Sequence, residues 1–208
     1  MPLDLWLAFV VASMVLCIIP GPTVLLVISY ALSQGRKVAV ASAGGVALGD
    51  LVAMTASLVG LGTLVLASAT LFTVLKWIGA AYLVYLGAKL FMSAAEVTPG
   101  AVEAPRSTRL AEIFAHAAAV TALNPKSIAF FIAFVPQFMR PEAPLLPQFI
   151  ILIATFVVVG FLNALLYALL ADRMRVAIAR PSVLRVLTRL GGATLVAMGV
   201  ATAALRRA

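Results

Sequence analysis

Pro20-Gly21-Pro22 interrupts an apolar stretch that runs from Leu5 to Tyr30. A second interruption, Asn124-Pro125-Lys126, lies inside an apolar stretch in the other half of the chain. A helix in a bilayer tolerates a proline or a charge only where the freed backbone groups and the ion face protein or a water-filled cavity. The two interruptions therefore predict a polar solute path through an otherwise apolar protein.

The composition of the 208 residues indicates a membrane protein, because 64% are hydrophobic, 11% are charged and the mean hydropathy is +1.15. A soluble core of this size has no room for so much apolar surface. The N-terminus, Met1-Pro2-Leu3-Asp4, lacks the positive region of a cleavable signal. We therefore expect the first apolar stretch to remain as a span.

Apolar windows of about 20 residues predict six transmembrane helices. These windows cover residues 5–30, 38–66, 71–92, 113–135, 146–171 and 186–205. We expect one all-α integral membrane domain over residues 1–208, in which a polar linker at about 93–112 separates repeat one, at about 1–92, from repeat two, at about 113–208.

The two halves of the chain resemble each other. Residues 74–87 align with residues 186–199 with seven identities, including two matched glycines. A constant offset also places Pro22 on Pro125, Gln34 on Gln137 and Lys37 on Arg140, and Asp50 falls close to Asn163. Two copies of a three-span unit must enter the membrane from opposite sides, as in many secondary carriers. The predicted fold is therefore two inverted three-helix repeats, with broken helices one and four.

The Lys and Arg side chains are unevenly divided between the two sides of the predicted membrane domain, with ten on one side and four on the other. The richer side is expected to be cytoplasmic, which places both termini on the opposite, periplasmic side. Anchoring of this kind also accounts for the net charge of +8 without a nucleic-acid partner. The ten are Arg36, Lys37, Lys89, Arg106, Arg109, Arg173, Arg175, Arg180, Arg185 and Arg189, and the four are Lys76, Arg140, Arg206 and Arg207.

The matched breaks predict a substrate site near the midplane. Unwound backbone there exposes N–H and C=O groups that can hold the carboxylate and the ammonium of a small zwitterion. The alternative is a pair of proline kinks that serve packing only. The candidate substrate-binding residues are Pro20, Gly21, Pro22, Asp50, Asn124, Pro125, Lys126 and Asn163.

Asp50 is the acidic residue that lies well inside a predicted span, where a charge costs about 2.5–3.5 kcal/mol on insertion scales. It is either a structural ion-pair partner of Lys126 or a coupling group that takes a proton on one side and an ammonium on the other. We expect the two charges to pair, and a substrate zwitterion to compete with that pair. Lys126 is also open to a substrate carboxylate, and Asn163 is either a polar wall of the cavity or an interhelical hydrogen-bonding group.

The remaining polar residues are interpreted as packing residues. One cysteine, Cys17, excludes an intramolecular disulfide, and one histidine, His116, excludes a multi-histidine metal cage. The four tyrosines, Tyr167 among them, are expected at membrane interfaces or in packing seams. We predict no metal, no cofactor and no enzymatic activity.

Four motifs in order resemble those of the LysE/RhtB family of amino-acid exporters. They are Pro20-Gly21-Pro22, Gly35-Arg36-Lys37, the stretch from Val74 to Leu83, and Leu123-Asn124-Pro125-Lys126-Ser127 followed by Pro136-Gln137-Phe138. The resemblance covers nearly the whole chain. It adds Thr23 to the candidate site, since many family members carry Asn or Asp there and Thr keeps an oxygen but loses the charge or amide donors.

The resemblance implies a bacterial inner-membrane carrier that exports an amino acid or close derivative by proton antiport. Asp50 is the expected proton-coupling residue because of its position inside a span. Substrates in the family include homoserine, threonine, leucine, cysteine and basic amino acids. The expected partners are a zwitterionic amino acid, protons and lipid, with a homodimer left open. The alternatives are an ion or heavy-metal exporter of the same superfamily, for which one Cys, one His and one intramembrane Asp are a poor supply of ligands, and a membrane scaffold that transports nothing.

Overall fold

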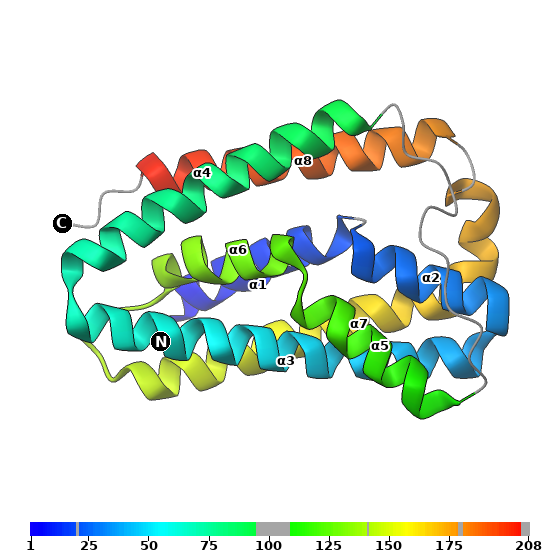
Figure 1. Cartoon of the computed structure of the whole chain (residues 1–208), viewed down its shortest axis with the longest axis horizontal. Coiled ribbons are helices and arrows are strands. Elements are labelled where there is room, and N and C mark those ends of the chain that lie inside the picture. The colour runs from blue at the N-terminus through cyan, green and yellow to red at the C-terminus, as the bar shows by residue number, and fades with distance from the viewer. Residues whose placement is uncertain (20, 95–108, 141, 179–180, 205–208) are drawn as a thin grey trace.

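The computed structural model describes residues 1–19, 21–94, 109–140, 142–178 and 181–204, and all regular structure in these ranges is helical. The helices lie mostly along one axis of an elongated bundle (Figure 1). In chain order they are α1 (Leu3–Ile18), α2 (Pro22–Gln34), α3 (Arg36–Ala67), α4 (Ala69–Ser93), α5 (Leu110–Ala122), α6 (Pro125–Ala133), the 3-10 helix η1 (Val135–Phe138), α7 (Leu145–Ile178) and α8 (Pro181–Ala204).

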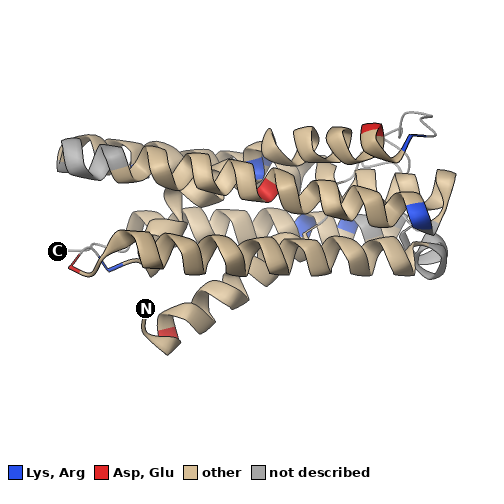
Figure 2. Cartoon of the chain, turned by 90° about the horizontal axis from the view of Figure 1, so that it is seen from below, with Lys and Arg blue, Asp and Glu red and all other residues tan. Residues whose placement is uncertain are grey.

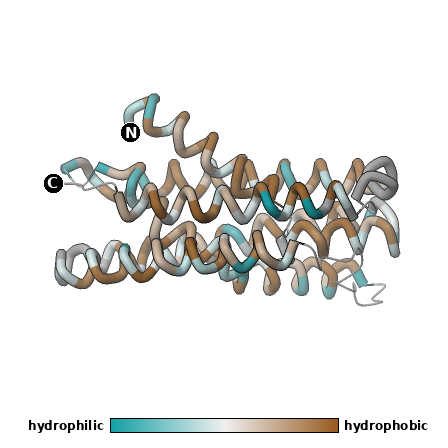
Figure 3. The backbone as a smooth tube through the Cα atoms, turned by 90° about the horizontal axis from the view of Figure 1, so that it is seen from above, coloured by the Kyte–Doolittle hydropathy of each residue, from teal (hydrophilic) through white to brown (hydrophobic). Residues whose placement is uncertain are grey.

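Four helices are long and apolar enough to cross a bilayer by themselves. Their apolar parts are Lys37–Gly62, Thr73–Ser93, Leu145–Ala171 and Arg185–Ala204. The pair α1 and α2 qualifies only together, with a bend of 55°, and α5 is a shorter apolar helix. Apolar residues cover most of the bundle's length (Figure 3), and charged residues are sparse between its ends (Figure 2). The expectation of an all-α, multi-pass membrane protein is confirmed.

Both predicted breaks are present, and each proline begins a new helix. Pro22 and Pro125 occupy first-turn positions of α2 and α6, after extended backbone at Gly21 and Asn124. Proline suits a first turn because the N–H that it lacks has no partner within the helix there. Each break therefore separates two helices and is not a bend within one continuous helix.

Helices α4 and α8 lie side by side along one face of the bundle (Figure 1). A Cβ built at Gly87 would lie 2.5 Å from the carbonyl oxygen of Gly192, closer than real side chains come. The same helices meet again where Gly199 lies against Ala80 and Val84. Small residues thus let the two backbones approach closely, which is how membrane helices commonly associate.

Helix α3 packs between α5 and α7 and brings Asp50 to the centre of the bundle. A Cβ at Gly49 would lie 2.6 Å from Thr121 Cβ of α5, so α3 and α5 are in close contact beside Asp50. On the α7 side, a Cβ at Gly160 would overlap Asp50 Oδ2. Glycine at these positions therefore makes room for a carboxylate between three helices.

Candidate functional site

A cavity of about 40 Å³ lies where the two helix breaks meet α3 and α7. Apolar side chains such as Phe156 form part of its wall. Its polar lining comes from Thr23, Asp50, Asn124, Lys126, Ser127 and Asn163. Five of these six are residues that the sequence singled out, and they belong to four different helices or helix caps.

The two breaks lie directly against each other. Asn124 Nδ2 donates to Thr23 Oγ1 at 3.1 Å, and Thr121 Oγ1 donates to the same oxygen at 3.4 Å. A Cβ at Gly21 would lie 3.4 Å from Lys126 Nζ. The first turns of α2 and α6 therefore meet at the cavity, although their residues are about a hundred positions apart in sequence.

The C-terminal end of α1 also points into this region, and side chains of other helices satisfy its carbonyl groups. Lys126 Nζ donates to the carbonyl oxygens of Leu16, at 3.0 Å, and Ile19, at 3.1 Å. Asn163 Nδ2 donates to Cys17 O at 2.9 Å. The last carbonyls of a helix lack intrahelical partners and carry partial negative charge, so a lysine placed there is stabilising.

Tyr167 completes this arrangement, since its hydroxyl donates to Ile18 O at 3.0 Å. The sequence predicts this tyrosine at an interface or in a packing seam, and its role at the break is an addition from the structure. A signal was available in the sequence: Tyr167 follows Asn163 by four residues, which puts both side chains on one face of α7.

His116, which the sequence predicts as a packing residue, lies with its Nδ1 2.8 Å from the Tyr30 hydroxyl.

Asp50 is 4% exposed and shares the cavity with Lys126, but the two do not form an ion pair within 4.0 Å. The expected charge pair is therefore absent from this structure. The pair does not form because the Lys126 ammonium donates its hydrogen bonds to two carbonyl groups at the end of α1. Asn163 likewise serves that terminus, so it is both a cavity wall and an interhelical hydrogen-bonding residue.

Several predicted site residues do not line the cavity. Pro22 and Pro125 are exposed and do not line the cavity. Gly21 is half-buried against Lys126. Pro20 lies outside the described residues. The prolines therefore shape the site through the backbone, and the side chains that face the cavity come from neighbouring positions.

The cavity is too small for an amino acid. A water-sized space needs about 10–15 Å³ on this measure, so 40 Å³ holds a few water molecules, whereas small-molecule pockets usually span about 300–1,000 Å³. The cavity therefore has room for water but not for an amino acid in this structure. In the described part of the chain, no three His, Cys, Asp or Glu side chains gather as a metal site would require.

Comparison with known proteins identifies the family of the chain. The model of a protein family described as "LysE type translocator" matches residues 14–205. The "Homoserine/homoserine lactone efflux protein" of Salmonella typhimurium is 33% identical over 208 residues, which is 100% of both chains. The "Leucine efflux protein" of Salmonella typhi is 32% identical over 160 residues, which is 76% of this chain and 74% of that protein.

An "Uncharacterized membrane protein" of Vibrio cholerae is 32% identical over 200 residues, covering 96% of this chain and 97% of its own. No solved structure matches the chain. The match to the family extends over both helix breaks and every element that lines the cavity except the start of α1. The chain therefore belongs to the LysE family of membrane translocators.

Proposed function

We propose that this protein exports a neutral amino acid, or a close derivative of one, and that the substrate binds in the cavity between the two helix breaks. The observation that carries the proposal is the convergence of Asp50, Lys126, Asn124 and Asn163 on one buried cavity in a protein of this family. Relatives named for efflux of homoserine and of leucine support a neutral substrate.

The helix ends at the cavity suit the two charges of a zwitterion. Helices α2 and α6 begin there, and the positive ends of their dipoles attract a carboxylate. Helix α1 ends there, and the partial negative charge of its last carbonyl groups favours an ammonium. Asp50 supplies the negative charge for the substrate ammonium, and Lys126 supplies the positive charge for its carboxylate.

Asp50 is also the proposed proton carrier. Its side chain is buried, lines the cavity and has no ion pair within 4.0 Å among the described residues. A buried carboxylate without a counter-ion is unfavourable, so it is stabilised either by a proton or by a substrate ammonium. Exclusive binding of one or the other would couple export of the amino acid to entry of a proton.

Counterflow of labelled amino acids tests the proposed function. The purified protein is reconstituted into liposomes loaded with unlabelled homoserine, leucine or lysine, and uptake of the matching radiolabelled compound is measured. We expect counterflow of homoserine or leucine and none of lysine, because a second ammonium would meet Lys126 in the same cavity. Protein-free liposomes are the control. Absence of counterflow for all three, with protein that elutes as a single folded species, would contradict an amino-acid carrier.

We further propose that the chain forms six spans as two inverted repeats, in a bacterial inner membrane with both termini in the periplasm. Contacts between α4 and α8 support the repeat. The alignment of residues 74–87 with 186–199 makes Gly199 the counterpart of Gly87, and Ala80 and Val84 the counterparts of Gly192 and Val196. Gly87 lies against Gly192 and Val196, and Gly199 lies against Ala80 and Val84, as a twofold axis between the helices requires.

Thiol labelling of two exposed positions tests this topology. Ser33, in the last turn of α2, and Glu142, after η1, lie near corresponding ends of the two repeats, so an inverted repeat places them on opposite sides. In a Cys17→Ser background, Glu142→Cys should react with a membrane-impermeant reagent in intact cells, and Ser33→Cys should react only after lysis. Labelling of both from the same side would refute the inverted arrangement.

A further inference from the structure

A second hollow lies at one end of the bundle, away from the helix breaks. It is a groove of about 1170 Å³ between α1, α4, the α6–η1 segment and α8. Its walls are mainly apolar, with Thr73, Lys76 and Gln137 as polar exceptions. The groove is large enough for an amino acid with its hydration water, and the cavity at the breaks is not.

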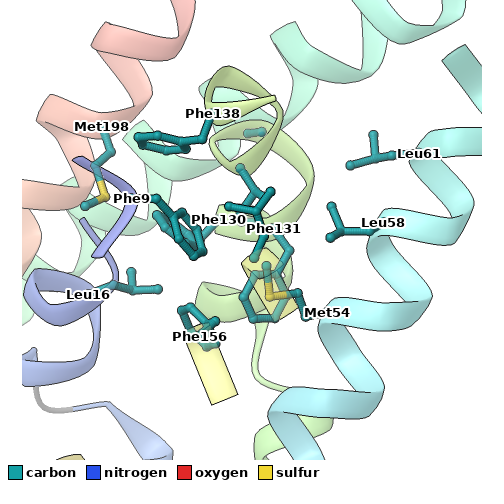
Figure 4. Packing of buried hydrophobic residues seen from close by; sticks show 14 of the residues in the cluster. Phe9, Leu16, Met54, Leu58, Leu61, Phe130, Phe131, Phe138, Phe156 and Met198 are labelled. Atoms are coloured by element: carbon teal, nitrogen blue, oxygen red, sulfur yellow. The ribbon is translucent and has the colours of Figure 1, made fainter. Parts of the chain in front are cut away.

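A row of phenylalanine rings connects the cavity to this groove. Phe156 lines the cavity, and its ring centroid lies 6.0 Å from that of Phe130. Phe130 lies 5.3 Å from Phe134, and Phe134 lies 5.3 Å from Phe138. Phe134 and Phe138 line the groove. Figure 4 shows Phe130 between Phe138, on one side, and Phe156, on the other.

Three of the four rings in this row are buried. Phe130 and Phe156 are at most 1% exposed, and Phe138 is 8% exposed. Phe9 of α1 closes the row against Phe138, with ring centroids 5.4 Å apart. A dry apolar constriction of this kind is a barrier to water and to a zwitterion, because neither finds hydrogen-bonding partners within it.

Three of the rings belong to one short segment. Phe130, Phe134 and Phe138 recur every four residues along α6 and η1, and each ring contacts the next with centroids 5.3 Å apart, so the three lie on one side of that segment. The segment begins at the second helix break and ends in a 3-10 turn, so it is not part of a long continuous helix. A tilt of this one segment would move all three rings together.

We propose that Phe130, Phe134, Phe138 and Phe156, with Phe9, form the gate between the substrate cavity and the groove, and that the solute path continues through the groove. This inference rests on the proposed function, in which the cavity is the substrate site. The apolar walls of the groove suit a passage, since they offer a zwitterion few polar partners with which to form a second stable site.

Cys17 provides a direct reporter of the gate. It lines the cavity and is the chain's only cysteine. The rate at which a small, membrane-impermeant methanethiosulfonate modifies Cys17 therefore measures access to the cavity. We compare the parent protein with Phe134→Ala, which removes a half-buried ring from the row. The reagent is added to one side of oriented vesicles at a time, and the groove side is the side from which Glu142→Cys reacts in the Cys17→Ser protein.

Phe149→Ala is the matched control. Phe149 also packs against the buried hydrophobic residues that include Phe130 and Phe156. It faces α3, however, where a Cβ at Gly62 would lie 3.4 Å from its ring. It does not line the groove or the cavity. Phe138→Ala is a second test variant, used if Phe134→Ala fails to elute as a single species.

We expect Phe134→Ala to raise the rate of Cys17 modification from the groove side by about tenfold, because it removes both ring contacts of Phe134. Phe149→Ala should leave the rate at the parent value. The gate would be overturned if the rate stayed unchanged in both Phe134→Ala and Phe138→Ala. It would also be overturned if Phe149→Ala raised the rate equally, or if the rate rose only from the opposite side. The labelling needs no transported solute, so the gate stands or falls on it whatever the counterflow experiment shows.

Discussion

Asp50→Asn is expected to reduce export driven by a pH gradient to background while the protein still folds and inserts. The substitution keeps the size of the side chain, so the close contact with Gly160 is preserved. It removes the group that exchanges a proton for a substrate ammonium in the proposed cycle. Without that exchange an imposed pH gradient has no means of driving the amino acid across the membrane.

The measurement is uptake of radiolabelled homoserine or leucine into inside-out vesicles, with and without an imposed pH gradient. Asp4→Asn is the matched control, since Asp4 is an exposed residue in the first turn of α1 and lies outside the cavity. It should retain the parent rate. If Asp50→Asn accumulated substrate as the parent does, with the same response to the gradient, Asp50 would be a packing residue and the proton would follow another route.

Lys126→Met is expected to impair both stability and substrate binding. The substitution leaves the carbonyl groups of Leu16 and Ile19 without their donor. A buried polar group that loses its partner costs about 1–3 kcal/mol, and the positive charge that favours the α1 terminus is lost as well. A marked drop in the unfolding temperature should therefore accompany the loss of the substrate carboxylate's proposed partner.

Thermal unfolding in detergent and binding of homoserine or leucine by calorimetry measure these two effects. Lys89→Met is the control, because Lys89 is an exposed residue of α4 that does not line the cavity. It should change neither quantity appreciably. Unaltered unfolding and binding in Lys126→Met would show that the α1 terminus finds other donors and that the carboxylate binds elsewhere.

Much of the site was readable from the sequence because the bilayer makes polar residues scarce and therefore informative. Asp50, Lys126, Asn124 and Asn163 stood out as polar groups within apolar stretches, and the structure brings all four to one cavity. The role of Tyr167 was not readable in the same way. Tyrosine is common at membrane interfaces, so its presence did not by itself indicate a bond to Ile18 O.

The places where helices end were also determined locally. Pro22 and Pro125 lack a backbone donor, and Gly21 and Asn124 readily adopt the extended conformation that precedes a helix. Such preferences act within a few residues and need no tertiary contact. The same locality accounts for the agreement between the predicted apolar windows and the helices α3, α4, α7 and α8.

An apolar, helical membrane protein with two breaks and a few buried polar groups follows from local sequence, because each of these properties depends on neighbouring residues and on the bilayer. Which of the polar groups meet depends on how distant helices pack. Lys126 bonds to the carbonyls of Leu16 and Ile19, more than a hundred residues away, and not to Asp50. The carbonyl groups at the end of α1 lack intrahelical partners and compete with Asp50 for the ammonium, and the relative positions of α1, α3 and α6 decide that competition.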